Sequence, residues 1–318
     1  MSDTRVHRTS HRVEVAAPAG VLYGLIADTV RWPLFFPPSI HVEQLEFDGT
    51  HERLRIWATA NGRVTSWTSV RSLDPELRRV DFRQQVPASS VESMGGTWIV
   101  EARGGDRSQL TLLHDFVVPG DAADKVAWVQ GATDTNSRAQ LDRLKDVAER
   151  WTRLDDLVLL FEDSVRVNGP AELVYDFLYR AGDWPELAPH VRRVELTEQA
   201  PGVQVMSMDA SGADGELHTT ESVRICFPHA GRIVYKQTAP PALMAAHTGE
   251  WSVEPDATGV TVTAQHQVVL NEADIERMLG EGAGLAAARR RVREDLGRAG
   301  TLMLALAKQH AESAVRVL

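Results

Sequence analysis

An arginine and a serine, Arg71 and Ser69, share one face of a segment whose alternating side chains are typical of a β-strand. The preceding Asn61-Gly62 predicts a two-residue hairpin turn, which places Arg71 opposite Glu52 on the neighbouring strand. The face that carries the apolar residues should point inward, and Ser69 and Arg71 lie on it. A buried guanidinium offers five fixed donors that stabilise negative charge developing on oxygen. The alternative is a structural ion pair with Glu52, and both roles can hold.

The Ser-Val-Arg sequence returns at residues 222–224, and further matches show that the chain contains one unit twice. Residues 11–37 align without gaps to residues 163–189. The matched pairs include Trp32 with Trp184, Ser69 with Ser222, Arg71 with Arg224 and Trp98 with Trp251. This repeat predicts two like domains, over residues 1–152 and 153–318.

Each copy predicts the same order of elements. A strand precedes a helix that begins at a proline, and a Trp-Pro segment, about six alternating strands and a long C-terminal helix follow. In the first copy Leu141, Leu144, Ala148 and Trp151 are expected on one face of the long helix, with Thr133, Asn136 and Ser137 further up on the same side. We expect an α+β domain in which a curved antiparallel sheet wraps the long helix and leaves a cavity between them. This is the helix-grip architecture.

The order of motifs resembles the START-like polyketide cyclase family over nearly the whole chain, and its duplication resembles the di-domain aromatase/cyclases of bacterial aromatic polyketide pathways. The motifs are Pro-Ala, Trp-Pro followed by Pro, Ser-x-Arg on a middle strand, and Gly-x-Trp before the long helix. The resemblance implies a cofactor-independent enzyme that acts on a poly-β-ketone carried by an acyl carrier protein and already reduced at one keto group. It would close the first ring by aldol addition and remove water. The alternative is a non-enzymatic carrier or chaperone-like module for a hydrophobic small molecule.

The resemblance gives Arg71 and Ser69 the role of polarising substrate carbonyls. Aromatic residues would form the walls of the cavity, although each by itself is more typical of an ordinary core. The expected substrate-binding residues are Trp32, Phe35, Phe36, Trp67, Arg83, Trp98 and Asn136. The second copy keeps Trp184, Ser222, Arg224 and Trp251 but has Leu187, Ala188 and Thr220 in place of Phe35, Phe36 and Trp67. We therefore expect the main reaction chamber in the first copy.

Three polar positions allow a functional and a structural interpretation. Arg83 follows Phe82 and is either a second cation of the cavity or a solvated residue. Asn136 could bind substrate from the long helix or join a structural network. His114 and Asp115 are adjacent, so alternation sends their side chains to opposite faces, which argues against an acid–base pair. Either residue alone could still move a proton.

Composition excludes several classes of protein. The net charge of −10 argues against general nucleic-acid binding. A single cysteine, Cys226, excludes a disulfide framework, and no metal-ligand spacing occurs. No apolar run reaches the roughly 20 residues of a membrane span. The N-terminus lacks the apolar region of a signal peptide, so a cytoplasmic protein is expected.

The last helix carries a cluster of arginines at positions 289, 290, 291 and 293. The default interpretation is a solvated helix face. The alternative is a docking site for the acyl carrier protein, an acidic partner that the resemblance implies together with other polyketide synthase components. In a chain of net negative charge, Arg289, Arg290, Arg291 and Arg293 would attract such a partner.

Overall fold

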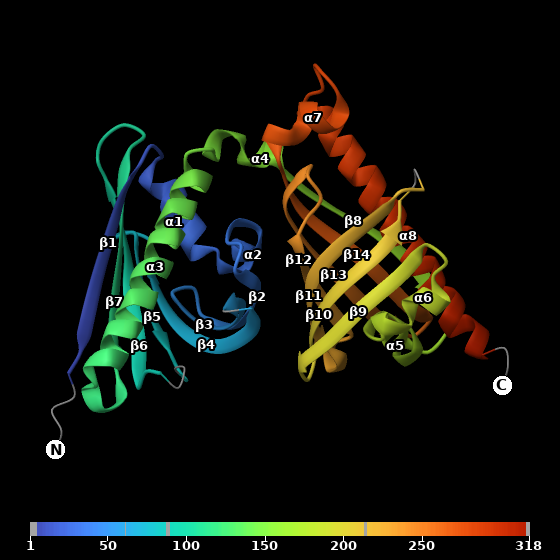
Figure 1. Cartoon of the computed structure of the whole chain (residues 1–318), viewed down its shortest axis with the longest axis horizontal. Helices are drawn as coiled ribbons and strands as arrows, with labels where there is room; N and C mark the ends of the chain where they lie inside the picture. The colour runs from blue at the N-terminus through green and yellow to red at the C-terminus, as the bar shows by residue number, and fades with distance from the viewer. Residues whose placement is uncertain (1–4, 61, 87–89, 213–214, 316–318) are drawn as a thin grey trace. The chain divides into compact units, whose positions relative to one another are not determined.

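The computed structural model describes residues 5–60, 62–86, 90–212 and 215–315. The chain divides into two units, Met1–Leu154 and Asp155–Leu318. The boundary lies two residues beyond the one that the sequence repeat indicates. Each unit has a curved sheet with a long helix across it (Figure 1).

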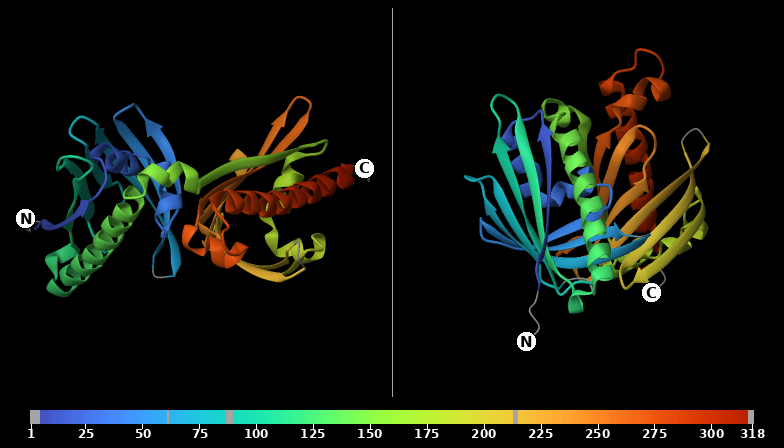
Figure 2. Two further views of the ribbon diagram at one scale, coloured as in Figure 1. Left: turned by 90° about the horizontal axis from the view of Figure 1, so that it is seen from above. Right: turned by 60° about the vertical axis from the view of Figure 1, so that its left-hand side comes forward.

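The first unit contains one antiparallel sheet of seven strands in the order β1-β7-β6-β5-β4-β3-β2. Its strands are β1 (His7–Val15), β2 (Ser39–Phe47), β3 (His51–Ala60), β4 (Arg63–Asp74), β5 (Arg79–Gln84), β6 (Ser93–Ala102) and β7 (Ser108–Val117). Its helices are α1 (Ala19–Ala27), α2 (Trp32–Phe35) and α3 (Ala123–Ala148), and α4 (Leu154–Leu157) lies at the boundary. In Figure 2, α3 runs across the strands of this sheet.

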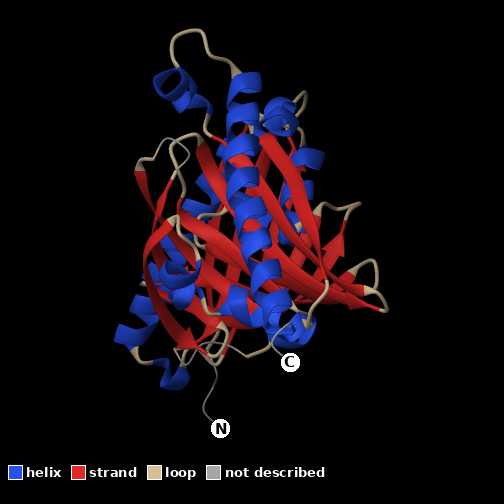
Figure 3. Ribbon diagram, turned by 90° about the vertical axis from the view of Figure 1, so that its right-hand side faces the viewer, coloured by secondary structure: helices blue, strands red, loops and turns tan. Residues whose placement is uncertain are grey.

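The second unit repeats this plan, with the sheet order β8-β14-β13-β12-β11-β10-β9. Its strands are β8 (Val158–Val167), β9 (Val191–Ala200), β10 (Val203–Ser211), β11 (Leu217–Phe227), β12 (Arg232–Ala239), β13 (Met244–Asp256) and β14 (Gly259–Leu270). Its helices are α5 (Ala171–Tyr179), α6 (Trp184–Leu187), α7 (Ile275–Leu279) and α8 (Leu285–Val315). Figure 3 shows α8 lying across the second sheet. The predicted α+β fold with two tandem helix-grip domains is confirmed.

The register of β3 against β4 follows the predicted hairpin. Gly62 has a φ of 74°, a left-handed value that a two-residue turn requires and that glycine adopts without strain. Asn61 of the predicted turn lies outside the described residues. The paired positions are Ala58 with Thr65, Ile56 with Trp67, Leu54 with Ser69 and Glu52 with Arg71. The inward direction of Ser69 and Arg71 follows from this pairing.

The C-terminal half of α3 packs against the first sheet. Leu141, Leu144 and Ala148 are each at most 2% exposed and join one core cluster with Trp98 and Leu112. Nearer the N-terminus of α3 the same face carries small polar residues rather than leucines. Still nearer the N-terminus, Val129 is buried with Phe116 and Val118, so the polar part of this face lies in the middle of the helix.

Candidate active site

Arg71 points into the first unit, as predicted, and is 4% exposed. Its Nη1 lies 3.0 Å from Oε1 of Glu52. Its Nη2 donates a hydrogen bond of 2.8 Å to the carbonyl oxygen of Ile26, in the last turn of α1. The ring of Trp32 lies 5.4 Å from the guanidinium carbon. The structural pair with Glu52 is therefore present.

The Arg71–Glu52 pair is neutral overall but not fully hydrogen-bonded. Oε2 of Glu52 accepts a hydrogen bond of 2.7 Å from Nε2 of Gln44. Nη1 of Arg71 and Oε1 of Glu52 are close, yet neither forms a well-directed hydrogen bond with any described group. Burial lowers the pKa of Arg71 to about 10, against the opposing effect of Glu52, so the guanidinium remains charged at neutral pH. One of its donors is still unused.

The second copy changes the partner of its arginine. Arg224 is 2% exposed, and its Nη1 donates a hydrogen bond of 2.9 Å to Oε1 of Gln204. Gln204 lies opposite Arg224 as Glu52 lies opposite Arg71. Within the described ranges no carboxylate forms an ion pair with Arg224, so the second interior holds an uncompensated positive charge. Trp184, whose ring lies 5.4 Å from the guanidinium carbon of Arg224, is buried, as are Ser222 and Trp251 of the same unit.

In both copies an arginine and a tryptophan donate hydrogen bonds to carbonyl groups at the C-terminal end of the first helix. Arg224 donates to the carbonyl oxygen of Leu178 at the end of α5, as Arg71 does to Ile26 at the end of α1. Nε1 of Trp32 donates to Leu25 at 3.1 Å, and Nε1 of Trp184 donates to Phe177 at 3.0 Å. These bonds satisfy carbonyl groups that a helix leaves without partners at its C-terminus. The repeated Trp-Pro and Ser-x-Arg motifs therefore have a structural role in each unit.

Ser69 is buried on the same face as Arg71, but its hydroxyl is engaged elsewhere. It is 3% exposed and donates a hydrogen bond of 3.2 Å to the carbonyl oxygen of Arg83. Its oxygen still has lone pairs, so it can accept but not easily donate to a bound molecule.

The five expected wall residues fall into two groups. Phe35 and Trp98 are each 5% exposed and lie in the packed core. Trp32, Phe36 and Trp67 remain half-buried, and Trp32 meets Phe36 edge to ring with centroids 5.4 Å apart. Only the second group keeps the accessible surface that the wall of a cavity needs.

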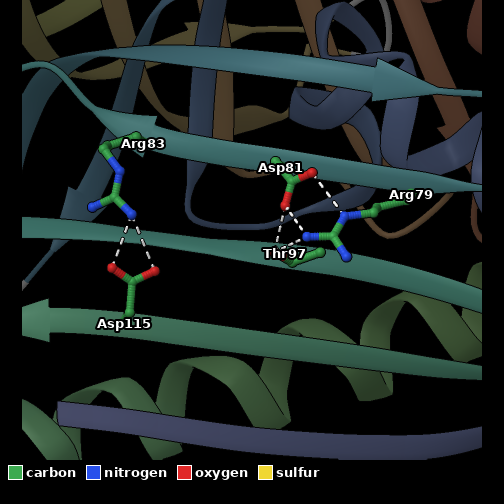
Figure 4. A network of polar contacts seen from close by, with 5 residues as sticks. All are labelled: Arg79, Asp81, Arg83, Thr97 and Asp115. Carbon is green, nitrogen blue, oxygen red and sulfur yellow. Dashed lines mark hydrogen bonds and ion pairs between the residues drawn. The ribbon is translucent and has the colours of Figure 1, made fainter. Parts of the chain in front are cut away.

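Arg83 is not a second cation of the interior, and this expectation is wrong. Its guanidinium is half exposed on the outer face of the sheet and donates to both carboxylate oxygens of Asp115, at 2.9 and 3.2 Å. It reaches β7 by crossing Gly95, where a Cβ atom would lie 2.9 Å from the guanidinium carbon (Figure 4). On the inner side, the ring of Phe82 covers Gly96 in the same way, at 2.7 Å from an added Cβ. Because these two glycines have no Cβ atoms, Arg83 can lie across the outer face of the sheet and Phe82 across the inner face.

The outer face around Arg83 is hollowed, with a volume of about 970 Å³. Arg79 donates to both carboxylate oxygens of Asp81, and Thr97 donates to Asp81 at 2.6 Å (Figure 4). These charges, like Arg83 and Asp115, are already paired with one another. Asp81, Arg83 and Asp115, which line the hollow, are therefore already in ion pairs.

The polar face of α3 consists of Thr133 and Ser137, not Asn136. Thr133 is 4% and Ser137 is 1% exposed, whereas Asn136 is exposed. One residue corresponds to a rotation of about 100° around a helix, which takes Asn136 off the buried face. The expected role of Asn136 in the interior is therefore not supported by its position.

His114 and Asp115 point to opposite faces, as alternation predicts. His114 faces the interior, where its Nδ1 lies 3.4 Å from Oγ of Ser137. Burial, with a smaller contribution from His11, lowers the pKa of His114 to about 4, so the imidazole is neutral at neutral pH. His114 is only half-buried. The sequence left His114 and Asp115 equally able to move a proton, and only the place of His114 opposite Gly96 could have favoured it.

The corresponding histidine of the second unit, His266, is buried and hydrogen-bonded. His266 lies opposite Gly249, is 4% exposed, and its Nδ1 is 3.2 Å from Oη of Tyr235 and 3.1 Å from Nε2 of His247. His247 is 2% exposed. Burial lowers the pKa of His247 to about 3 and that of His266 to about 4. Both imidazoles are neutral at neutral pH.

These buried histidines predict a loss of stability in mild acid. Unfolded histidine has a pKa of about 6.5, above the folded values, so the unfolded state takes up protons first as pH falls. The free energy of unfolding should reach its maximum above about pH 6.5. Between pH 7 and pH 5 it should fall by roughly 1–2 kcal/mol for each of His247 and His266. Urea unfolding at the two pH values measures the change. His247→Met introduces the residue that the first copy has at this position (Met94) and should reduce the difference in stability between the two pH values. Equal stability of the wild type at both pH values would contradict the burial of neutral histidines as the cause of that difference.

Comparison with known proteins identifies the family. The model of the family "Polyketide cyclase / dehydrase and lipid transport" matches residues 6–149 and again residues 159–303. The chain belongs to this family. The two matches correspond to the two units of the structure.

Several members of the family are similar to this chain over its length. The bifunctional cyclase/dehydratase of the actinorhodin polyketide synthase from Streptomyces coelicolor is 44% identical, over 93% of this chain and 94% of that protein. The granaticin bifunctional cyclase/dehydratase from Streptomyces violaceoruber is 40% identical, over 98% and 95%. Among solved structures, the di-domain ARO/CYC BexL from the BE-7585A biosynthetic pathway superposes with a TM-score of 0.90. It is 47% identical, over 96% of this chain and 99% of that one.

Most arginines of the α8 cluster form hydrogen bonds or ion pairs within the second unit. Arg289 donates to the carbonyl oxygens of Asp156 and Val158 at 2.6 and 2.8 Å. Arg291 pairs with Asp295 at 2.6 Å, and Arg293 pairs with Asp163 at 2.8 Å. Of the four, Arg290 alone is exposed without a partner among the described residues. Three of the four arginines therefore have partners within their own unit, and docking of a carrier protein at this cluster stays a prediction.

None of the described helices has the length and apolar character needed to cross a membrane.

Proposed function

We propose that this chain is an aromatase/cyclase that closes the first ring of a carrier-bound poly-β-ketone by aldol addition and then removes water to give an aromatic ring. Relatives named as polyketide synthase cyclase/dehydratases over more than nine-tenths of the chain support the reaction class. We place the reaction inside the first unit, between its sheet and α3.

One observation carries this placement. Several side chains face the interior of the first unit and yet remain partly accessible, which indicates space between sheet and helix. These residues are Trp67, Phe82, Gln84, Met94 and His114. In the second unit, by contrast, His247 and His266 are buried at the positions of Met94 and His114 and are hydrogen-bonded to each other.

The residues of the first interior suit a chain of carbonyl groups. Aldol addition forms a carbon–carbon bond between an enolate and a carbonyl carbon, and the carbonyl oxygen becomes an alkoxide. A fixed donor in a dry site stabilises that charge strongly, and Nη1 of Arg71 is such a donor. The accessible rings of Trp32, Phe36 and Trp67 would hold the chain in one folded conformation, which removes much of the entropic barrier to closure.

The proposed substrate already carries one hydroxyl in place of a keto group, because loss of that hydroxyl as water completes an aromatic ring. Neither ring closure nor dehydration changes the overall oxidation level of the substrate, so the proposal requires no redox cofactor. The polyketide would arrive on an acyl carrier protein from other polyketide synthase components. Within the arginine cluster, Arg290 is exposed and has no partner among the described residues, so it is the member most available to such a carrier.

Product analysis tests this function. The pure protein would be incubated with a polyketide synthase that lacks its own cyclase, and the products separated by mass. We expect a mixture of spontaneously cyclised products without the protein and one dominant first-ring aromatic product with it. A carrier or chaperone-like module would bind the chain without adding a dehydrated product. An identical product distribution with and without the protein would contradict the proposal.

A further inference from the structure

Three arginines without ion-pair partners lie where α2 packs against α3. Arg31 ends the short 3₁₀ turn that precedes α2, Arg143 lies in the C-terminal half of α3, and Arg150 lies just past the end of that helix. Arg31 and Arg150 are exposed, and Arg143 is half-buried. None of the three forms an ion pair with a carboxylate in the described part of the chain. We call this group the arginine seam.

Arg143 is fixed in place and still has unused donors. Its Nε donates a hydrogen bond of 2.7 Å to the carbonyl oxygen of Phe35, which holds the guanidinium against α2. The guanidinium carbon of Arg31 lies 5.5 Å from the centre of the Phe35 ring, so both arginines contact the same residue. No described group accepts a hydrogen bond from either Nη atom of Arg143. These two nitrogens therefore form a free, oriented fork of donors.

The surroundings of Arg143 favour an anion. Burial lowers its pKa, the charge of Arg150 acts in the same direction, and Asp146 opposes them. A partly desolvated cation without a partner is costly, and an anion that binds to it removes part of that cost.

The arginine seam lies next to the aromatic wall of the first interior. Phe36 directly follows Phe35, and its half-buried ring meets that of Trp32 with centroids 5.4 Å apart. The ring of Trp32 in turn lies 5.4 Å from the guanidinium carbon of Arg71. A continuous row of contacts therefore leads from Arg143 at the surface to Arg71 in the interior.

The second unit has no cation at the corresponding positions. The long helices can be aligned because Lys145 of α3 and Lys308 of α8 each donate to a carbonyl oxygen of the first strand of their unit. By this alignment and the sequence repeat, the counterparts of the three arginines are Asp183, Leu306 and Ser313. The same fold therefore forms without these cations, which indicates that the fold does not need them.

We propose that the arginine seam is the docking site of the acyl carrier protein, with the phosphodiester of its phosphopantetheine arm bound to the Nη atoms of Arg143, an assignment that rests on the proposed function. A guanidinium fork matches two phosphate oxygens in geometry and charge. Arg31 and Arg150 face acidic side chains of the carrier, and the polyketide chain enters past Phe36. The seam belongs to the unit that holds the proposed reaction chamber, whereas the exposed Arg290 of α8 belongs to the other.

The first experiment measures the Kd of the full chain for a fluorescently labelled holo acyl carrier protein by anisotropy. Arg31→Glu/Arg150→Glu is compared with Arg290→Glu/Arg298→Glu, which makes the same change of charge at two exposed arginines of α8. We expect the seam variant to raise Kd by about tenfold or more, since like charges facing each other across an interface are strongly unfavourable. The α8 variant should stay within about twofold of the wild type. With carrier-bound substrate, the seam variant should raise KM by a similar factor and leave kcat nearly unchanged.

The second experiment tests the phosphodiester with holo and apo forms of the same carrier, which differ only in the arm. The wild type should bind the holo form about fivefold more tightly or better, since hydrogen bonds between charged groups are the strong ones. Arg143→Met should bind both forms alike. If Arg143→Met melts early, the exposed pair Arg31→Glu/Arg150→Glu decides the docking site, because it leaves the bond from Arg143 to Phe35 in place.

Three results would overturn the docking site: an unchanged Kd in the folded seam variant, an equal loss in the α8 variant, or a wild type that does not bind the holo carrier. A preference for the holo form that persists in folded Arg143→Met would overturn the placement of the phosphodiester. Seam-dependent binding without an aromatic product would contradict the proposed function and leave the docking site. Product formation with binding that does not depend on the seam would do the reverse.

Discussion

Arg71→Ala should lower the free energy of unfolding by about 3–5 kcal/mol, because it leaves the carboxylate of Glu52 buried without its cation. The substitution also removes the donor to the carbonyl oxygen of Ile26 at the end of α1. In a domain of this size each kcal/mol shifts the melting temperature by roughly 2–4 °C, so the first unit should melt on the order of 10 °C earlier. Thermal and urea unfolding followed by circular dichroism measure the change.

The second copy provides the matched control. Arg224→Ala leaves the neutral amide of Gln204 rather than a charge, so the expected loss is smaller, about 1–3 kcal/mol. Glu52→Gln in the Arg71→Ala background should restore part of the stability, because it removes the uncompensated carboxylate. Equal losses at the two arginines, with no recovery from Glu52→Gln, would show that the ion pair is not what makes the first arginine indispensable.

The fold could be predicted because its evidence is repeated and local. The sequence repeat identifies two like domains, and one Asn-Gly turn sets the register of two strands. That register correctly placed Glu52 opposite Arg71 and turned Ser69 inward. The same alternation separated His114 from Asp115.

The parts that could not be predicted depend on residues distant in sequence. The direction of Arg83 is decided by Gly95 and Gly96 of the next strand, which leave room for one side chain on each face. Arg289 and Arg293 of α8 find partners about 130 residues earlier in the chain, such as Asp163 for Arg293. The bond from Arg71 to the end of α1 is equally non-local. Asn136 fails for a local reason, since helix phase from pattern alone is uncertain by one residue.

The paired variant Glu52→Gln/Arg71→Met should lose first-ring product by about 10²–10³-fold, the usual effect of removing a fixed donor from a site of developing negative charge. Removing both charges together avoids the stability loss of the single alanine, since a buried pair can often be replaced by neutral residues at little cost. Arg224→Met in the second unit should act mainly through stability. Its surroundings, with Leu187, Ala188 and Thr220, lack the flat walls that would fold a polyketone.

The most direct test of a reaction chamber in the first unit is the rate of first-ring product formation by these two variants, measured side by side below both melting temperatures. We expect Glu52→Gln/Arg71→Met to lose product by about 10²–10³-fold. We expect Arg224→Met to stay within about threefold of the wild type, since no substrate is placed beside Arg224. An equal loss in both variants at unchanged folding, or a larger loss at Arg224, would contradict a reaction chamber in the first unit.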